Sequence, residues 1–447
     1  MLGALVGVAL AVCCGSPARL ALPPPVDGGT LGPLRLVMPV GEPQGLVFLF
    51  SDLAGPTAEF DRAAQRLAEA GAVVAPVDLE PFLARQDALP RDCLYLVADI
   101  EEASRRIQAQ GGRGRYLTPV VAGTGMGAAV AYAALAQAPD ATLSGAASDG
   151  FATRIATTKP LCAGAPFTPA AAGGFEYGPT NLPGWWRVAP AADETEAAAA
   201  FAAAAGAEDA LVPPAIEGGL GERLAALLDP ALVTPAENGL AGLPLVELPV
   251  ATAAGGGLVA VVYSGDGGWR DLDKEIAGRL QAKGIPVVGV DSLRYFWSEK
   301  TPERVAGDLA AVLAHYRVAW QRPDVLLVGY SFGADVLPFA YNRLPEDEKA
   351  RVRRMALLGL APTADFEIHV TGWLGVEAHA GSRPTAPELA RIPPELVQCF
   401  YGAEEDDTAC TLPELKGAEL VRTPGGHHFD GDYGKLADAI IAGVARR

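Results

Sequence analysis

Ser331 is the residue in this chain best placed to act as a nucleophile. It lies in Gly-Tyr-Ser-Phe-Gly at 329–333, directly after the apolar run 325–328, and residues 334–343 can continue as a helix. A short apolar run of this kind is typical of a buried parallel strand. A sharp turn from strand to helix would strain the serine backbone and expose its hydroxyl, while the two glycines allow close approach. The other interpretation is a tight turn whose serine caps the helix.

His427 is the predicted base. A serine nucleophile needs a base to accept its proton and a carboxylate to orient that base. His427 lies in Pro-Gly-Gly-His-His-Phe at 424–429, on a glycine loop between an expected strand and the last helix. The second histidine, His428, is expected to pack or to contact substrate.

The carboxylate is expected in the acidic cluster at 404–407, directly after an expected strand at 396–402. In the nucleophile-elbow arrangement the acid follows the serine and precedes the histidine along the chain. We favour Asp407, with Glu405 as the second choice and Asp406 as the third, because spacing alone does not choose among them.

The negative oxygen formed during acyl transfer needs two backbone N–H donors. One is expected from Phe332, the residue after the nucleophile, and the other from Gly265 or Asp266 in Ser-Gly-Asp-Gly-Gly-Trp at 264–269. Glycine-rich loops also bind phosphates, but no Lys-Ser/Thr pair follows this one. No cysteine and histidine group has zinc spacing, so the sequence predicts neither a metal nor a cofactor.

The sequence predicts an internal duplication of one fold. In each half a strand is followed by a loop, a helix, a strand ending in aspartate, another helix and an elbow-like strand; the two elbows lie at 123–127 and 329–333. Alternating strands and helices predict a mostly parallel sheet in each copy. The expected fold class is therefore α/β, with two tandem α/β-hydrolase-like domains, the first of them degenerate.

The first copy is expected to be catalytically silent. Gly125 occupies its nucleophile position, and no histidine occurs before His315. Without a nucleophile and a base no serine-hydrolase triad can form, so this half is predicted to be a scaffold, a partner surface or a substrate-guiding wall. Every expected catalytic group lies in the second half.

The composition suggests an exported chain of several segments. We expect a signal-like segment at 1–21, the degenerate domain at 22–236, a linker at 237–248 and the catalytic domain at 249–447. The apolar run at 2–12 is too short to span a bilayer and resembles a secretory signal; lipoprotein anchoring is the less favoured alternative. The remaining Cys93, Cys162, Cys399 and Cys410 suggest two disulfides, most simply Cys93–Cys162 and Cys399–Cys410.

The net charge of the chain limits the kinds of molecule that it is expected to bind. The formal net charge is −18, which argues against direct nucleic-acid binding, because phosphate contacts need clustered Lys and Arg. The same charge is compatible with a cationic substrate.

Four stretches of the second half resemble the VirJ family of bacterial virulence proteins, and the two-copy length is similar to its longer, AcvB-like members. The stretches are Tyr-Ser-Gly-Asp-Gly-Gly-Trp-Arg-Asp-Leu-Asp-Lys at 263–274, Gly-Tyr-Ser-Phe-Gly-Ala-Asp at 329–335, Tyr401-Gly402 with Cys410, and Gly-Gly-His-His-Phe at 425–429. The resemblance implies a periplasmic α/β-hydrolase that hydrolyses aminoacylated phosphatidylglycerol, typically the lysyl ester. It also implies an association with type IV secretion, so a non-enzymatic periplasmic adaptor or chaperone is the alternative function.

Several residues are expected to contact such a substrate at a membrane surface. Asp266, Glu404 and Asp406 are candidates for a cationic aminoacyl group. The segment 360–394 lies where such folds carry lids, and its apolar residues, Trp373 among them, either meet lipid or pack internally.

Overall fold

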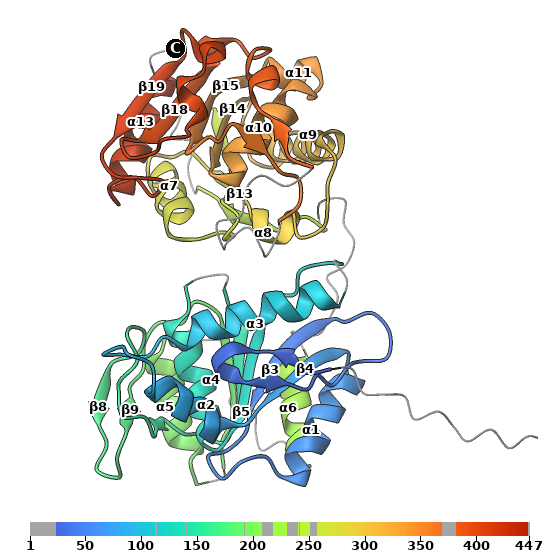
Figure 1. The fold of residues 1–447 in the computed structure, drawn as a ribbon, viewed down its shortest axis with the longest axis vertical. Helices are drawn as coiled ribbons and strands as arrows, with labels where there is room; N and C mark the ends of the chain where they lie inside the picture. Colours follow the sequence, from blue (N-terminus) through green and yellow to red (C-terminus); the bar gives the residue numbers. More distant parts are fainter. Residues whose placement is uncertain are drawn as a thin grey trace, which may run out of the picture.

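The computed structural model describes residues 24–111, 114–139, 142–191, 193–207, 218–229, 240, 242–250, 257–368 and 381–445. It contains two α/β domains in tandem, each built around its own sheet (Figure 1). The expected α/β class with mostly parallel sheets is confirmed.

The first domain has a five-stranded parallel sheet in the order β10-β6-β5-β3-β4. Its main elements are β3 (Gly45–Phe50), α1 (Ala58–Glu69), β4 (Ala72–Val77), α2 (Leu79–Asp87), α3 (Leu96–Gln110), β5 (Val120–Thr124), α4 (Met126–Gln137), β6 (Gly145–Asp149), β10 (Trp185–Ala189), α5 (Thr195–Ala204) and α6 (Leu220–Leu228). A hairpin of β1 (Val26–Asp27) and β2 (Pro33–Leu34), and a meander of β7 (Arg154–Ile155), β8 (Phe167–Pro169) and β9 (Phe175–Tyr177), lie outside that sheet.

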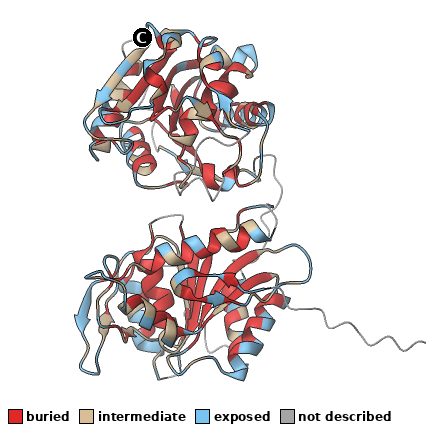
Figure 2. Cartoon of the chain, viewed as in Figure 1, coloured by how far each residue is buried: buried red, intermediate tan, exposed pale blue. Residues whose placement is uncertain are grey.

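Helices cover both faces of this sheet because its strands are apolar on both sides. Leu46, Phe48 and Phe50 of β3 pack against α2, α3 and α4, whereas the alternate residues Val47 and Leu49 pack against α1 and α6. Figure 2 shows the buried strands in red beneath helices whose outer faces are exposed.

The second domain has a seven-stranded sheet in the order β11-β13-β12-β14-β15-β18-β19, in which only the edge strand β11 runs antiparallel. Its elements are β11 (Leu245–Leu248), β12 (Leu258–Tyr263), α7 (Asp271–Ala282), β13 (Val287–Val290), α8 (Ser292–Tyr295), α9 (Pro302–Ala319), β14 (Asp324–Tyr330), α10 (Phe332–Asn342), α11 (Glu346–Lys349), β15 (Val352–Leu358), α12 (Ala386–Leu389), β18 (Val397–Gly402), β19 (Glu419–Thr423) and α13 (Tyr433–Ala445). A short ladder joins β16 (Thr363–Ala364) to β17 (Arg383–Pro384).

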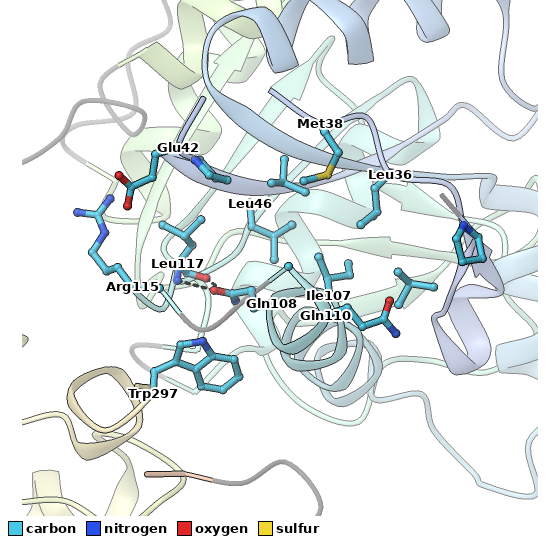
Figure 3. Close-up of a pocket in the computed structure, with 16 residues that line it drawn as sticks. Leu36, Met38, Glu42, Leu46, Ile107, Gln108, Gln110, Arg115, Leu117 and Trp297 are labelled. Atoms are coloured by element: carbon cyan, nitrogen blue, oxygen red, sulfur yellow. Dashed lines mark hydrogen bonds between the residues drawn. The ribbon is translucent and has the colours of Figure 1, made fainter. Parts of the chain in front are cut away.

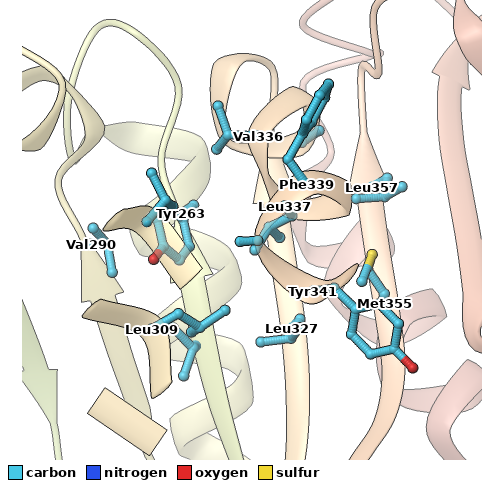
Figure 4. Packing of buried hydrophobic residues seen from close by; sticks show 14 of the residues in the cluster. Tyr263, Val290, Leu309, Leu327, Val336, Leu337, Phe339, Tyr341, Met355 and Leu357 are labelled. Carbon is cyan, nitrogen blue, oxygen red and sulfur yellow. The ribbon is translucent and has the colours of Figure 1, made fainter. Parts of the chain in front are cut away.

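This sheet is also covered on both faces. Tyr263, Leu327 and Leu357 point from β12, β14 and β15 toward α9 and α10, as Figure 4 shows. The alternate side chains of the same strands pack against α7 and α13. The sheet therefore forms a rigid base, and β14 ends directly beneath the start of α10.

The two sheets share one topology. The order β4-β3-β5-β6-β10 of the first domain corresponds to β13-β12-β14-β15-β18 of the second, and the second adds an edge strand at each side. One expected boundary is shifted, because residues 245–248, which we assigned to the linker, form β11. They pair antiparallel with β13, and partial burial of Leu245 and Val246 against the second core accounts for it.

Each domain contains one disulfide. Cys93 is bonded to Cys162 in the first domain, and Cys399 to Cys410 in the second, with Cα atoms 4.8 Å and 5.6 Å apart. Both pairs are those that the sequence favoured. In the part of the chain that the structure describes, no helix is long and apolar enough to cross a membrane, and the expected signal segment 1–21 lies outside it.

Candidate active site

Ser331 lies at the turn between β14 and α10, with φ 50° and ψ −119°. A non-glycine residue at positive φ is strained by about 1–3 kcal/mol, which the surrounding structure must offset. The Ser331 N–H donates to Leu358 O at 2.8 Å, and glycine at 329 and 333 lets the chain fold back tightly, because a Cβ at either position would clash with backbone. The turn thus has the geometry of a nucleophile elbow.

His427 stands next to the serine. Its Nε2 is 2.8 Å from Ser331 Oγ, and its Nδ1 is 2.7 Å from Glu405 Oε1. If Nδ1 carries the proton, it donates to Glu405, and Nε2 is free to accept the proton of the serine hydroxyl. The His427 side chain is 45% exposed, so the site opens to solvent.

Glu405, rather than the favoured Asp407, is the carboxylate at His427. After β18 the chain turns so that the Gly402 N–H donates to Glu405 Oε2 at 2.6 Å, leaving Oε1 directed at the histidine. Asp406 and Asp407, the next two residues, are both exposed. Neither has a hydrogen bond to His427 among the described residues. The preference for Asp407 was wrong, because side-chain direction in this loop depends on how it turns back onto the end of β18.

Backbone amides lie beside the serine where a negative oxygen would form. Phe332 is the first residue of α10, where the N–H has no intrahelical acceptor, and no acceptor for it occurs among the described residues. The loop after β12 approaches from the other side: a Cβ built on Gly265 would lie 3.6 Å from Ser331 Cβ. The amides of Gly265 and Asp266 likewise have no acceptor within the described chain. These are the three residues expected to supply the donors.

Gly359 and Tyr330, two residues that sequence reasoning missed, support the loop that carries His427. Gly359, just after β15, has φ +66°, and a Cβ there would lie 2.8 Å from His427 Cε1, so only glycine leaves room for the ring. His428 Nδ1 is 2.9 Å from the Tyr330 hydroxyl, which ties the histidine loop to the elbow strand. Gly359 could have been predicted from the sequence as a glycine directly after a strand that ends near the site. The sequence contains no signal for the contact between Tyr330 and His428.

The expected substrate residues are distributed unevenly. Asp266 is half-buried in the loop beside Ser331, whereas Glu404 and Asp406 are exposed on the acid loop. Trp373 lies outside the described residues. Of the expected lid, Phe366 and Ile368 are buried in the core, where Phe366 packs against Phe339 and Phe296, so these two do not face a substrate.

In the first domain, the place that corresponds to the oxyanion site is occupied by the side chain of Asp52. Gly125 keeps the elbow conformation, with φ 57° and ψ −126°, and the next residue, Met126, donates its N–H to Asp52 Oδ1 at 2.8 Å. Asp52 is the counterpart of Gly265, one residue after the serine that follows each first strand. A Cβ on Gly125 would clash with Asp52 Oδ1. A carboxylate therefore takes the position that an oxyanion would occupy in an active copy.

A buried carboxyl group lies behind the site. Asp273 is 2% exposed, and its Oδ2 accepts the Arg270 N–H at 3.3 Å. Burial raises the pKa of Asp273 well above its usual range, and the negative charge of Asp291 adds to the effect.

An apolar cavity of about 640 Å³ lies in the first domain, away from this cluster (Figure 3). Leu36, Met38, Leu46 and Ile107 line it, and Trp297 of the second domain closes one side. Ser331, His427 and Glu405 do not contribute to it. No group of three or more His, Cys, Asp or Glu among the described residues could hold a metal ion.

The chain is similar to one known family and to several solved structures. The sequence model of a family described as "Bacterial virulence protein (VirJ)" matches residues 257–447. No curated protein is similar enough to count as a match.

Three solved structures match part of this chain. Est1E from Butyrivibrio proteoclasticus, solved with ferulic acid, is 12% identical with a TM-score of 0.33; the match covers 46% of this chain and 94% of that one. An α/β serine hydrolase without lid from Xanthomonas campestris is 19% identical with a TM-score of 0.31, covering 45% and 87%. A lipase-esterase related protein from Clostridium acetobutylicum is 14% identical with a TM-score of 0.32, covering 45% and 98%. Likenesses of this degree concern the chain fold alone.

Proposed function

Residues 257–447 match the VirJ family model, and from this premise we propose that the chain is a serine esterase acting on the aminoacyl ester of an aminoacylated phosphatidylglycerol, with the lysyl ester as its substrate. The observation that carries the esterase is the hydrogen-bonded chain from Ser331 Oγ through His427 to Glu405 Oε1. Nucleophile, base and carboxylate in this order are the parts that acyl transfer requires.

In the first step Ser331 Oγ attacks the carbonyl carbon of the aminoacyl ester while its proton moves to His427 Nε2. Glu405 stabilises the imidazolium that results, because its carboxylate accepts from Nδ1. The amides of Phe332 and of Gly265 or Asp266 hold the negative oxygen. The ester C–O bond then breaks, and the glycerol oxygen takes the proton from His427. Phosphatidylglycerol departs, and the aminoacyl group remains bound to Ser331 as an ester.

In the second step water attacks this ester and gives its proton to His427. The intermediate collapses, the amino acid leaves, and the proton returns to Ser331 Oγ. With a side chain 45% exposed, His427 has direct access to the water that this step consumes.

A cationic aminoacyl group is the substrate that the surrounding charge favours. Asp266 lies beside the nucleophile, and Glu404 and Asp406 lie exposed on the acid loop. The formal net charge of −18 would also attract a cation to the surface. These carboxylates support a lysyl ester over a neutral one.

Two disulfides support a location in an oxidising compartment such as the periplasm, where phospholipid headgroups of the membrane surface are within reach. Components of type IV secretion remain the proposed partners of the alternative function, in which the chain acts as an adaptor. Its silent first domain is the feature that favours that alternative.

The test is release of free amino acid from vesicles of phosphatidylglycerol containing a lysylated fraction. The unaltered chain should release lysine, and Ser331→Ala should lower the rate by at least about 10⁴-fold, as loss of a serine nucleophile does. Vesicles of unmodified phosphatidylglycerol serve as the blank. Equal release by both proteins would refute the esterase, and a Ser331→Ala strain with an unaltered secretion phenotype would favour the adaptor.

A further inference from the structure

One face of α3 in the first domain carries polar side chains that are nevertheless buried. Glu101, Ser104, Arg105 and Gln108 follow one another at helical spacing, with exposures of 9%, 0%, 5% and 9%. Apolar residues of the same helix, such as Ile100 and Ile107, belong to the first core. Buried polar groups need hydrogen-bond partners. Gln108 finds them in the first domain, at Ser104 and Leu117. This face is covered in part by the second domain, which faces α3 in Figure 1.

Glu101 makes the contact that crosses between the domains. Its Oε1 accepts from the guanidinium of Arg270 in the second domain and also from Arg105 on its own helix. The Glu101 side chain is 12% exposed and that of Arg270 31%. A charged pair that is this far from solvent holds its geometry far better than a surface pair.

Aromatic packing places the same interface. Tyr116, in the segment that follows α3, is 5% exposed, and its ring meets that of Trp297 edge to face with centroids 4.9 Å apart. Tyr116 clusters with the core of the second domain rather than with that of the first. The contact through Glu101 is therefore part of a packed interface.

Arg270 closes the loop that carries the expected oxyanion donors. The loop runs from Ser264 to Arg270, and the Gly268 N–H donates to Gly265 O at 3.1 Å, which folds it into a turn. Its start is fixed to the second domain, because Ser264 Oγ accepts the Ser292 N–H at 2.9 Å. At its far end the Arg270 N–H donates to Asp273 at the start of α7, and the Arg270 side chain reaches the first domain through Glu101. The amides of Gly265 and Asp266 lie between these two anchors.

Charge also reaches across the boundary to this loop. Burial lowers the pKa of Arg105 to about 10, and interactions of the guanidinium with the Tyr116 side chain and with the Asp266 carboxylate partly oppose that shift. The guanidinium remains cationic at neutral pH and lies close enough to Asp266 to interact with a residue of the loop beside Ser331.

We propose that the silent first domain positions the oxyanion loop of the second: Glu101, through Arg270, holds the amides of Gly265 and Asp266 in place beside Ser331. Glu101 is thus a positioning residue, and this role deepens and rests on the esterase proposed above. The duplication then has a mechanical use, since the copy that lost its own nucleophile supports the site of the other. Every expected catalytic group still lies in the second half, and the first domain adds a contact that positions two of them.

The test uses the full chain and the release of lysine from lysylated phosphatidylglycerol vesicles. Glu101→Gln keeps the shape of the side chain and removes its charge, and Arg270→Gln removes the partner. Glu102→Gln is the matched control, because Glu102 is the next residue on α3 and pairs with Arg106, away from the second domain. The double variant Glu101→Gln/Arg270→Gln completes a cycle that isolates the coupling between the two side chains.

The loss of one oxyanion donor lowers kcat by about 10²–10³. We therefore expect Glu101→Gln to lower kcat at least about 10-fold with KM changed less than about threefold. Glu102→Gln should match the unaltered chain. The kcat of the double variant should be no lower than that of the less active single variant. The rate at which a fluorophosphonate modifies Ser331 should fall in parallel, because that reaction also develops a negative oxygen. Thermal unfolding of each variant checks that both domains are folded.

Three results would overturn the inference: unchanged kcat in Glu101→Gln, a rise in KM alone, or equal losses in Glu101→Gln and Glu102→Gln. The two proposals fail differently. If the unaltered chain has no turnover that depends on Ser331, the esterase itself is refuted and the positioning role with it. If turnover depends on Ser331 but not on Glu101, only the positioning role is refuted.

Discussion

Replacement of Glu405 by glutamine tests the proposed catalytic carboxylate with almost no change of shape. Both Glu405 oxygens accept hydrogen bonds from N–H groups: Oε2 from the Gly402 amide at 2.6 Å, and Oε1 from His427 Nδ1 at 2.7 Å. A glutamine has one oxygen and one NH₂ group, so it can satisfy only one of these donors. If the NH₂ group faces Nδ1, the imidazole is driven to the tautomer that carries its proton on Nε2, where it cannot accept the proton of Ser331.

The expected loss is large because both the tautomer and the stabilising charge are affected. In serine hydrolases the change of the triad acid to its amide lowers kcat by about 10⁴. A glutamine that keeps its oxygen toward the histidine would lose less activity than one whose NH₂ group faces it. We therefore expect kcat to fall by about 10³–10⁴-fold, or roughly 4–5.5 kcal/mol of transition-state stabilisation. KM should change little, since Glu405 does not lie where the ester would bind.

The assay is steady-state hydrolysis of a small soluble ester together with Ser331 labelling by a fluorophosphonate. Asp407→Asn is the control: its side chain is exposed and has no hydrogen bond to His427 among the described residues, so its kcat should stay within about twofold of the unaltered chain. If Asp407→Asn is the variant that loses activity and Glu405→Gln keeps it, the assignment of the acid is refuted.

Two further predictions concern residues around the site. Gly359→Ala should lower kcat by at least about 10-fold, because a Cβ at φ +66° would lie 2.8 Å from His427 Cε1 and displace the ring; steady-state kinetics with a thermal melt would show it, and unchanged kcat would contradict it. Asp273 should make the protein less stable as the pH rises. Its folded pKa is raised above the unfolded value near 3.9, so between the two values the folded state binds more protons and the free energy of unfolding falls with increasing pH. Asp273→Asn should flatten that slope in melts taken from pH 4 upward, and identical slopes would count against the buried acid.

The proposed nucleophile and base could be predicted from local sequence. The elbow is specified by neighbours in the chain: a buried strand, glycines at 329 and 333 that permit backbone contact, and a helix that starts at Phe332. His427 follows two glycines on a loop whose position is fixed by β19 and α13. Such features depend on a few consecutive residues, so their periodicity and turn chemistry can be read directly from the sequence.

The identity of the acid depended on the tertiary structure. Residues 404–407 are four consecutive carboxylates at nearly the same spacing from Ser331, and only the turn after β18 decides which of them faces His427. That turn is set by the Gly402 amide, which captures Glu405. The edge strand β11 is a similar case, since four residues in a presumed linker become a strand only because β13 offers them an open edge.

The contact between the two domains was also beyond the sequence. Glu101 and Arg270 are 169 positions apart. Arg270 lies in the glycine-rich stretch 263–274, but nothing in that stretch points to Glu101 as its partner. A buried polar stripe at helical spacing looks in sequence like an ordinary solvated helix face, because the pattern of a helix records which side is polar and not what covers it. The sequence thus determined two α/β copies and a serine with its histidine. The fold of the second domain after β18 decided which carboxylate faces His427, and the packing of one copy against the other decided that Glu101 pairs with Arg270. Both choices depend on contacts between segments that no local pattern connects.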